Sequence, residues 1–245
     1  MTALGVIPAR WGSTRFEGKV LAKIAGKPMI QHVWERARQA ESLDQVLIAC
    51  DDPKILKAAQ DFGAEAIMTS KHHASGTDRI AEAIQNIKSN IVVNIQADEP
   101  LINPQVIDDL VQVLEKDSTS VMATVIKVIK NKEDLNNPNV VKVVLDHEHN
   151  ALYFSRSLIP YYREGKEITF YKHLGIYAYR RDFLLTFTKL PKSKLENIEQ
   201  LEQLRALEAG YKIKTVLTER DTIAVDTPED LQKVETFLAN QHSLR

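Results

Sequence analysis

A loop near the start of the chain, residues 7–19 with the sequence IPARWGSTRFEGK, combines cationic side chains with small residues. Arginine binds phosphate oxygens in a bidentate manner, lysine acts as a mobile point charge, and a loop rich in small residues exposes backbone N–H groups. We therefore interpret Arg10, Arg15 and Lys19 as candidate ligands of a phosphate. The alternative is a solvated basic turn between a strand and a helix, and this loop alone does not decide between the two.

Two common phosphate-binding motifs do not fit this loop. Five residues separate Gly12 from Gly18 where a P-loop has four, and Val20 stands where that motif needs Ser or Thr. The G-x-G-x-x-G pattern of dinucleotide-binding folds does not match either. These two families are disfavoured.

Two acidic segments could supply a divalent cation site. Residues 94–100, NIQADEP, follow the most hydrophobic predicted strand, and Asp98 is the predicted ligand because Mg²⁺ prefers carboxylates together with substrate phosphates. Glu99 is interpreted as an ordinary loop residue. In residues 224–230, AVDTPED, the bare pattern predicts that Asp226 is a helix N-cap. It could also bind a metal only if its carboxylate points into a cleft.

Other segments carry weaker signals. Residues 73–79, HASGTDR, could hold a base, a ribose or a phosphate, although a plain helix cap by Thr77 explains them equally well. Arg156, His173 and Tyr177 lie in apolar stretches, where a packing role is the commoner one. None of these residues identifies a ligand by itself.

The first half of the chain alternates short apolar runs with amphipathic helical patterns. This rhythm predicts a three-layer α/β fold, because parallel strands need crossover helices, and ligands bind at the carboxyl ends of such strands. The predicted strands are 3–7 (ended by Pro8), 46–49, 66–68 and 91–95, and the predicted helices are 28–40, 55–62, 78–87 and 104–115.

The second half is less regular. Four predicted strands with few helices between them indicate a mostly antiparallel insertion over about residues 120–180: 121–128, 140–145, 151–154 and 173–179. A helix over 199–208, a strand over 213–216 and a helix over 228–238 follow. Because no linker stands out, we expect residues 1–245 to form a single domain.

Composition limits the function classes. The net charge of −1 over 245 residues gives no reason to expect nucleic acid or an anionic membrane as a partner. No apolar run approaches 18 residues, and the N-terminus lacks the pattern of a signal peptide. The single cysteine, Cys50, suits a reducing compartment. We expect a soluble cytoplasmic protein.

Taken together, the motifs resemble one family. IPARxxSTRxxGK, GKPMIxHVxERA, SGTxR, NxQxDEP, VKVVLDxxxxALYFSRxxIP, HLGIYxYR, IExLEQLRxL and VDTPEDL occur in this order in CMP-Kdo synthetases, the 3-deoxy-manno-octulosonate cytidylyltransferases. The resemblance extends from residue 3 to about residue 235. It implies a Rossmann-like nucleotide-diphospho-sugar transferase fold with a mainly parallel sheet, in which the insertion supports sugar binding and a homodimer. It also implies transfer of CMP from CTP to Kdo, with release of pyrophosphate, for lipopolysaccharide biosynthesis.

The resemblance also implies roles for individual residues. Arg10, Lys19, Asp98 and Asp226 would be catalytic, and the last two would bind Mg²⁺. The nucleotide ligands would be Ala9, Arg10, Ser13, Arg15, Lys19, Ser75, Gly76, Arg79 and Asp98. The sugar acid would be held by Gln96, Arg156, His173, Tyr177, Glu199, Glu202 and Gln203, with Arg156 as the partner of its carboxylate.

The chain departs from the family pattern at two positions. Glu17 stands where proline is common, and it places a negative charge beside the expected triphosphate unless it turns outward. Ala97 replaces a usual glycine and adds a Cβ. An acceptor with an 8-amino group in place of the 8-hydroxyl group is the alternative substrate. A different sugar nucleotidyltransferase and a non-catalytic nucleotide sensor are further alternatives. The retained carboxylates and the HLGIY and ALYFSR motifs argue against these two.

Overall fold

The computed structural model describes residues 1–12, 16–163, 168–220 and 223–242, with side chains as far as residue 239. The chain forms two compact units, Met1–Asp108 with Asp221–Arg245, and Asp109–Arg220. The boundary between them falls inside helix α4 (Pro104–Lys116), and the insertion predicted at 120–180 lies within the second unit.

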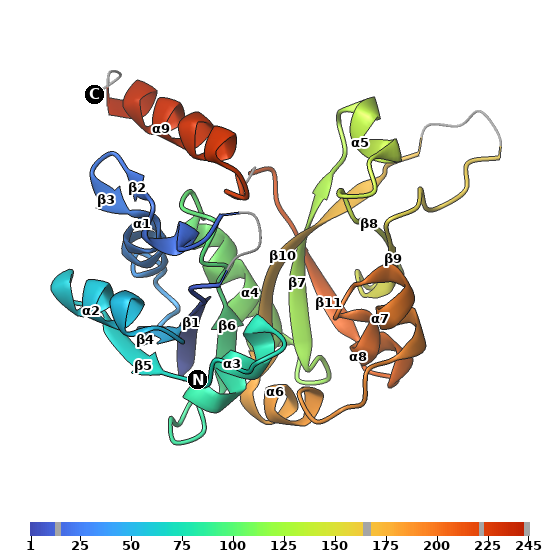
Figure 1. Cartoon of the computed structure of the whole chain (residues 1–245). Coiled ribbons are helices and arrows are strands. Elements are labelled where there is room, and N and C mark those ends of the chain that lie inside the picture. The colour runs from blue at the N-terminus through green and yellow to red at the C-terminus, as the bar shows by residue number, and fades with distance from the viewer. Residues whose placement is uncertain (13–15, 164–167, 221–222, 243–245) are drawn as a thin grey trace. The chain divides into compact units, whose positions relative to one another are not determined.

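The first unit is built on a parallel sheet. Strand β1 (Ala3–Ala9) pairs in parallel with β4 (Gln45–Cys50) and β6 (Ile91–Asn94), and β4 pairs in parallel with β5 (Glu65–Met68). Figure 1 shows these strands side by side in the order β6-β1-β4-β5. The apolar runs of β1, β4 and β6 are almost wholly buried, as expected for strands covered on both faces, whereas the edge strand β5 is partly exposed. The predicted parallel sheet is confirmed.

Strand β1 does not end at Pro8, as the sequence predicted, but continues to Ala9. The Val6 carbonyl accepts a hydrogen bond from Ile95 N. Since the backbone groups of alternate residues point to the same neighbouring strand, the backbone nitrogen of Pro8 also points to the β6 side. Strand β6 ends opposite Val6. The missing N–H of Pro8 therefore removes no bond between strands.

Short helices follow the strands of the first unit. They are the 3₁₀ helix η1 (Lys19–Leu21), α1 (Met29–Ala37), α2 (Pro53–Asp61) and α3 (Gly76–Ala83). The small hairpin β2 (Lys23–Ile24) and β3 (Lys27–Pro28) lies next to the last helix, α9 (Pro228–His242), as Figure 1 shows. A cluster of buried side chains joins them, including Ile24, Met29, Val225, Val234 and Leu238.

The second unit is mostly antiparallel. Strand β10 (Tyr171–Arg180) pairs antiparallel with β7 (Met122–Val128) and β8 (Lys142–Leu145), and β8 pairs antiparallel with β9 (Ala151–Ser155). Strand β11 (Ile213–Leu217), by contrast, is parallel to its neighbour β7. The antiparallel character predicted for residues 120–180 is confirmed.

Helices α5 (Lys132–Asn136) and α6 (Arg181–Phe187) flank these strands. The single helix predicted over 199–208 is wrong, because two helices, α7 (Lys194–Glu199) and α8 (Leu204–Glu208), occupy this region. Gln200 breaks the helix by adopting a left-handed conformation with φ of 53°. Its carbonyl and that of Glu199 are thereby left to accept hydrogen bonds from Arg156.

Among the helices that the structure describes, none combines the length and the apolar character needed to span a bilayer.

Candidate active site

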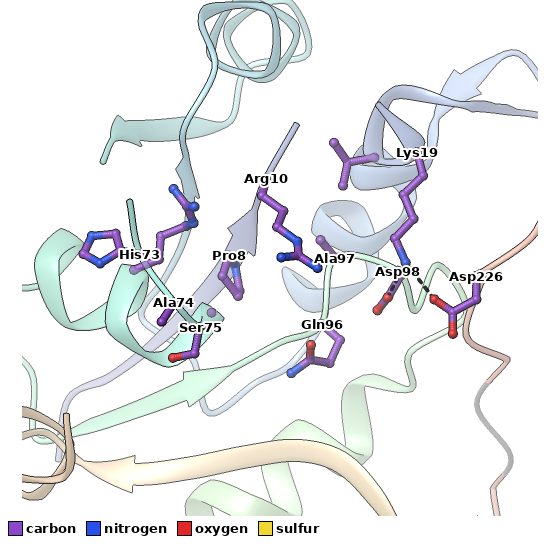
Figure 2. Close-up of a pocket in the computed structure, with 13 residues that line it drawn as sticks. Pro8, Arg10, Lys19, His73, Ala74, Ser75, Gln96, Ala97, Asp98 and Asp226 are labelled. Atoms are coloured by element: carbon purple, nitrogen blue, oxygen red, sulfur yellow. Dashed lines mark hydrogen bonds and ion pairs between the residues drawn. The ribbon is translucent and has the colours of Figure 1, made fainter. Parts of the chain in front are cut away.

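The first unit has a polar pocket of about 480 Å³ where β1 and β6 end. Its lining comes from the loops after these strands, from η1, from the start of α3 and from the segment before α9. The lining residues are Pro8, Arg10, Lys19, Val20, His73, Ala74, Ser75, Gly76, Arg79, Gln96, Ala97, Asp98 and Asp226. Figure 2 shows Lys19, Asp98 and Asp226 at one end, His73, Ala74 and Ser75 at the other, and Arg10 between them.

Lys19 joins the two acidic segments. Its Nζ lies 2.7 Å from Asp98 Oδ2 and 3.0 Å from Asp226 Oδ1, and it also donates to the Val225 carbonyl. Burial would lower the pKa of the Lys19 ammonium, but the two carboxylates outweigh it, and the pKa is raised above its ordinary value. Lys19 is therefore a fixed positive charge in the pocket.

The bare pattern predicted that Asp226 is the N-cap of α9, and this prediction is wrong. Thr227 caps the helix: its Oγ1 accepts from Asp230 N, and Asp230 Oδ2 accepts in return from Thr227 N. The Asp226 side chain therefore remains available, and it points toward Lys19 (Figure 2).

Arg10 and its neighbours form the middle of the pocket. Arg10, Gln96 and Ala97 all line it, whereas Ala9 is fully buried at the end of β1 and does not. The non-glycine residues with positive φ in the described chain are Ala25, His149 and Gln200. Ala97 is not among them, so its backbone does not demand glycine.

The rest of the predicted triphosphate loop is only partly described. Ser13 and Arg15 lie outside the described residues. Glu17 accepts a hydrogen bond of 3.0 Å from the indole Nε1 of Trp11 and is exposed to solvent. The Glu17 carboxylate is therefore hydrogen-bonded to the Trp11 indole.

The start of α3 forms the opposite wall. Ser75, and not Thr77, is the N-cap, because Ser75 Oγ accepts from Asp78 N. A Cβ on Gly76 would come within 3.2 Å of the Pro8 ring, so glycine allows the close approach of the helix to β1. Arg79 borders the pocket, but its guanidinium donates to Asp51 and Thr69 and is almost fully buried.

Three residues of this unit were missed or misread in the sequence. His73 lines the pocket and pairs with Glu82. Glu99, interpreted as a loop residue, is buried, and burial together with the nearby Asp98 raises its pKa to about 8. Asp51 joins Arg79 to the loop after β1. The helix start after His73 and the acidic doublets 51–52 and 98–99 were the available signals.

The remaining predicted sugar ligands belong to the second unit. Glu199 accepts from Ser155 Oγ at 2.6 Å and from Arg156 N at 2.9 Å. The Arg156 guanidinium donates to the carbonyls of Pro138, Glu199 and Gln200. These contacts tie the end of β9 to the break between α7 and α8.

His173 and Tyr177 lie close together on β10, with ring centroids 5.3 Å apart. Burial lowers the pKa of His173 to about 3, so its ring is neutral, and His173 Nε2 shares a hydrogen bond with Thr124 Oγ1. Burial, assisted by the charge of Glu202, raises the pKa of the Tyr177 hydroxyl. Gln203 is buried, and its Nε2 has no hydrogen-bond partner among the described residues.

The pocket of the first unit fits a divalent cation. No cluster of three or more His, Cys, Asp or Glu side chains suited to a metal occurs among the described residues. However, Lys19 brings two carboxylates to one point and contacts one oxygen of each. Mg²⁺ characteristically uses one or two carboxylates together with substrate phosphates. Open α/β sheets bind their ligands at the carboxyl edge, and cations with paired carboxylates at that edge are typical of proteins that bind nucleotides and handle phosphoryl groups.

Comparison with known proteins agrees with this class. A family model described as cytidylyltransferase matches residues 4–213. The 3-deoxy-manno-octulosonate cytidylyltransferase of Syntrophobacter fumaroxidans is 52% identical over 98% of both chains. The 8-amino-3,8-dideoxy-manno-octulosonate cytidylyltransferase of Shewanella pealeana is 52% identical over 95% of this chain and 97% of its own.

A solved structure gives the same result. The complex of CMP:2-keto-3-deoxy-manno-octonic acid synthetase with CTP superposes with a TM-score of 0.95, at 45% identity, over 98% of this chain and 100% of that one. The chain belongs to the cytidylyltransferase family.

Proposed function

We propose that this chain transfers CMP from CTP to the anomeric hydroxyl of Kdo and releases pyrophosphate. The sugar oxygen forms a bond to the α-phosphorus, the bond from that phosphorus to the bridging α–β oxygen breaks, and the hydroxyl proton passes to solvent. The activated sugar would serve lipopolysaccharide biosynthesis. Both curated relatives above carry cytidylyltransferase names, and the solved synthetase is a complex with CTP.

The observation that carries this proposal is the meeting of Lys19, Asp98 and Asp226 beside Arg10 in one pocket. The three residues come from η1, from the loop after β6 and from the segment before α9. Arg10 and Lys19 supply the positive charge that a triphosphate and a departing pyrophosphate require. Ser75 and Gly76 at the other end would adjoin the nucleoside.

Asp98 and Asp226 would hold Mg²⁺. The ion, when bound, would supply positive charge that makes the sugar hydroxyl more acidic and the pyrophosphate a better leaving group. Lys19 keeps the two carboxylates close together and neutralises part of their repulsion. No dedicated general base is needed for this role of the protein, since positioning and charge carry most of the catalysis.

The second unit would bind the sugar acid. Gln203 offers a buried N–H₂ group without a partner among the described residues, which is a costly arrangement unless a ligand accepts from it. Three of the five N–H groups of Arg156 donate to backbone carbonyls, and the other two could receive the sugar carboxylate. Glu199 accepts from Arg156 N, His173 packs on Tyr177, and the charge of Glu202 acts on Tyr177, so these four residues are further proposed sugar ligands in this unit. Gln96, also a proposed sugar ligand, lines the pocket of the first unit.

The test is pyrophosphate release with CTP, Kdo and Mg²⁺, repeated without the metal, without the sugar, and with UTP or ATP in place of CTP. Release that requires CTP, Kdo and Mg²⁺ supports the proposal. Binding of CTP without release would indicate a nucleotide-binding relative that lacks this activity.

The 8-amino analogue of Kdo is a second candidate acceptor. Relatives named for that substrate, such as the one from Shewanella pealeana, are as similar in sequence as those named for Kdo. The same assay with the two sugars in parallel, compared by kcat/KM, decides between them.

We also propose a cytoplasmic homodimer. The dimer rests on the family resemblance, and the compartment rests on the cysteine content. The unpaired, buried Cys50 suits a reducing compartment. In the second unit Tyr161 and Tyr162 are exposed and could contribute to an interface. Light scattering during gel filtration gives the mass in solution, and a monomeric mass would refute the dimer.

A further inference from the structure

We infer that Asp51 is a positioning residue for nucleotide binding, and that Arg79 acts through Asp51 instead of touching the nucleotide. The inference rests on the proposed function. Asp51 directly follows β4 and is 7% exposed. Its Oδ1 accepts from the backbone N–H of Trp11, the neighbour of the lining residue Arg10, at 2.8 Å. Its Oδ2 accepts from Nη2 of Arg79, another lining residue, at 2.9 Å.

The first contact controls the loop that bears the phosphate-binding cations. Trp11 is next to Arg10, and the Trp11 carbonyl accepts from Gly18 N at 3.0 Å, one residue before Lys19. The Trp11 backbone therefore joins the residues next to these two cations, and Asp51 holds that backbone. The indole is also held, by Glu17 at its Nε1 and by Lys54 Nζ at 4.2 Å from the ring centroid.

The second contact controls the opposite wall. Arg79 lies on α3, whose first residues line the pocket. Its guanidinium is nearly fully buried and donates through Nη1 to Thr69 Oγ1 at 2.6 Å and to the Ser70 carbonyl at 3.2 Å. Thr69 in turn bonds to the Cys50 carbonyl. Arg79 therefore fixes α3 to the ends of β4 and β5.

One carboxylate thus couples both walls of the pocket. A shift of about 1 Å in groups that bind a reacting substrate can cost about 100-fold in rate, so this coupling matters even without a contact to the nucleotide. Asp51→Asn keeps the size of the side chain and an acceptor for Trp11 N, but it removes the charge that pairs with Arg79.

The matched control is Asp108→Asn. Asp108 is also 7% exposed, lies in the same unit, and accepts a backbone hydrogen bond of 2.8 Å from Ser42 N, but it does not line the pocket. If Asp51 only stabilises the fold, the two variants should behave alike. If it positions the pocket, only Asp51→Asn should impair CTP binding.

The experiment measures CTP binding by calorimetry, KM for CTP and for the sugar, and melting temperature. Asp51→Asn is expected to weaken CTP binding by roughly 10- to 100-fold with the sugar KM unchanged, while Asp108→Asn lowers only the melting temperature. CTP binding within about threefold of the parent in Asp51→Asn would overturn the inference. A parent that does not bind CTP would overturn the proposed function, and the inference with it.

Two further measurements separate positioning from direct contact. In a Trp34→Phe background Trp11 is the sole tryptophan. In that background, Asp51→Asn should increase the quenching of Trp11 fluorescence by acrylamide. Arg79→Gln should add little to Asp51→Asn, because the two residues act as one unit. Additive losses would instead show that Arg79 binds the nucleotide by itself and would overturn its assignment. If Asp51→Asn does not fold, Arg79→Lys, which can satisfy only part of the same network, is measured in its place.

Discussion

Lys19 Nζ lies 2.7 Å from Asp98 Oδ2, although 79 residues separate the two along the chain. The same ammonium contacts Asp226, 207 residues away. One cation from a short 3₁₀ helix thus organises the two carboxylates that we propose as metal ligands. The arrangement leads to predictions that separate catalytic roles from structural ones.

Lys19→Met should lower kcat by roughly 100- to 1,000-fold, because it removes a fixed charge from the proposed site of phosphate transfer. It should also destabilise the fold, since Asp98 and Asp226 would face each other without a cation between them. Steady-state kinetics and thermal unfolding measure both effects. The control is Lys23→Met, at an exposed position on β2. An equal loss of kcat in both variants would contradict the role of Lys19.

Asp226→Asn should raise the Mg²⁺ concentration needed for half-maximal activity by at least about tenfold, because one proposed ligand loses its charge. Asp230→Ala tests the neighbouring cap instead, because alanine cannot accept the hydrogen bond from Thr227 N. It should cost about 1 kcal/mol of stability through the helix start and leave the Mg²⁺ dependence unchanged. Titration of Mg²⁺ in the pyrophosphate assay distinguishes them. Unchanged Mg²⁺ dependence in Asp226→Asn would refute the two-carboxylate site.

Glu99→Gln should raise the free energy of unfolding, relative to the parent, more at pH 8 than at pH 5. Burial first, and then the charge of Asp98, raises the pKa of Glu99 from 4.5 to about 8. Between these values the unfolded chain releases a proton that the folded chain keeps, so the parent loses stability as the pH rises, by roughly 1.4 kcal/mol per pH unit.

Urea unfolding of the parent and of Glu99→Gln at pH 5 and pH 8 checks this prediction. Glu41→Gln, at an exposed position, is the control and should follow the parent. A Glu99→Gln variant with the same pH dependence as the parent would show that Glu99 is ionised in the folded state.

Gln203→Met should raise the KM for the sugar acid without lowering the melting temperature. The Nε2 group has no partner among the described residues, so its removal costs no hydrogen bond within this part of the protein. The KM for CTP should stay unchanged, because Gln203 does not line the pocket that we propose for CTP. A fall in melting temperature with an unaltered sugar KM would make Gln203 a packing residue.

Local patterns predicted most of the elements. The apolar runs at residues 3–7, 46–49 and 91–95 form neighbouring parallel strands. A short, continuous apolar run is typical of a strand that is buried on both faces of a parallel sheet. Gly63 ends the turn after α2 with φ of 81°, as a glycine after a helix predicts. These signals act over a few residues and do not depend on the rest of the chain.

Distant partners overturned several local interpretations. The pattern at 199–208 is helical, yet Gln200 interrupts it where Arg156 binds the freed carbonyls. Asp226 has the ideal type for a cap, yet Thr227 takes that role while Lys19 binds the Asp226 carboxylate. In both cases the deciding partner lies more than forty residues away in sequence.

By itself the sequence determined most of the strand and helix segments, the basic loop after the first strand and, through the order of its motifs, the resemblance to a sugar-acid cytidylyltransferase. Only the tertiary structure decided which side chains face the pocket: Lys19 between two carboxylates, and Arg79 turned toward Asp51. The physical reason is range. Propensity and periodicity act between near neighbours, whereas the direction of a charged side chain follows from the opposite charge that folding brings beside it.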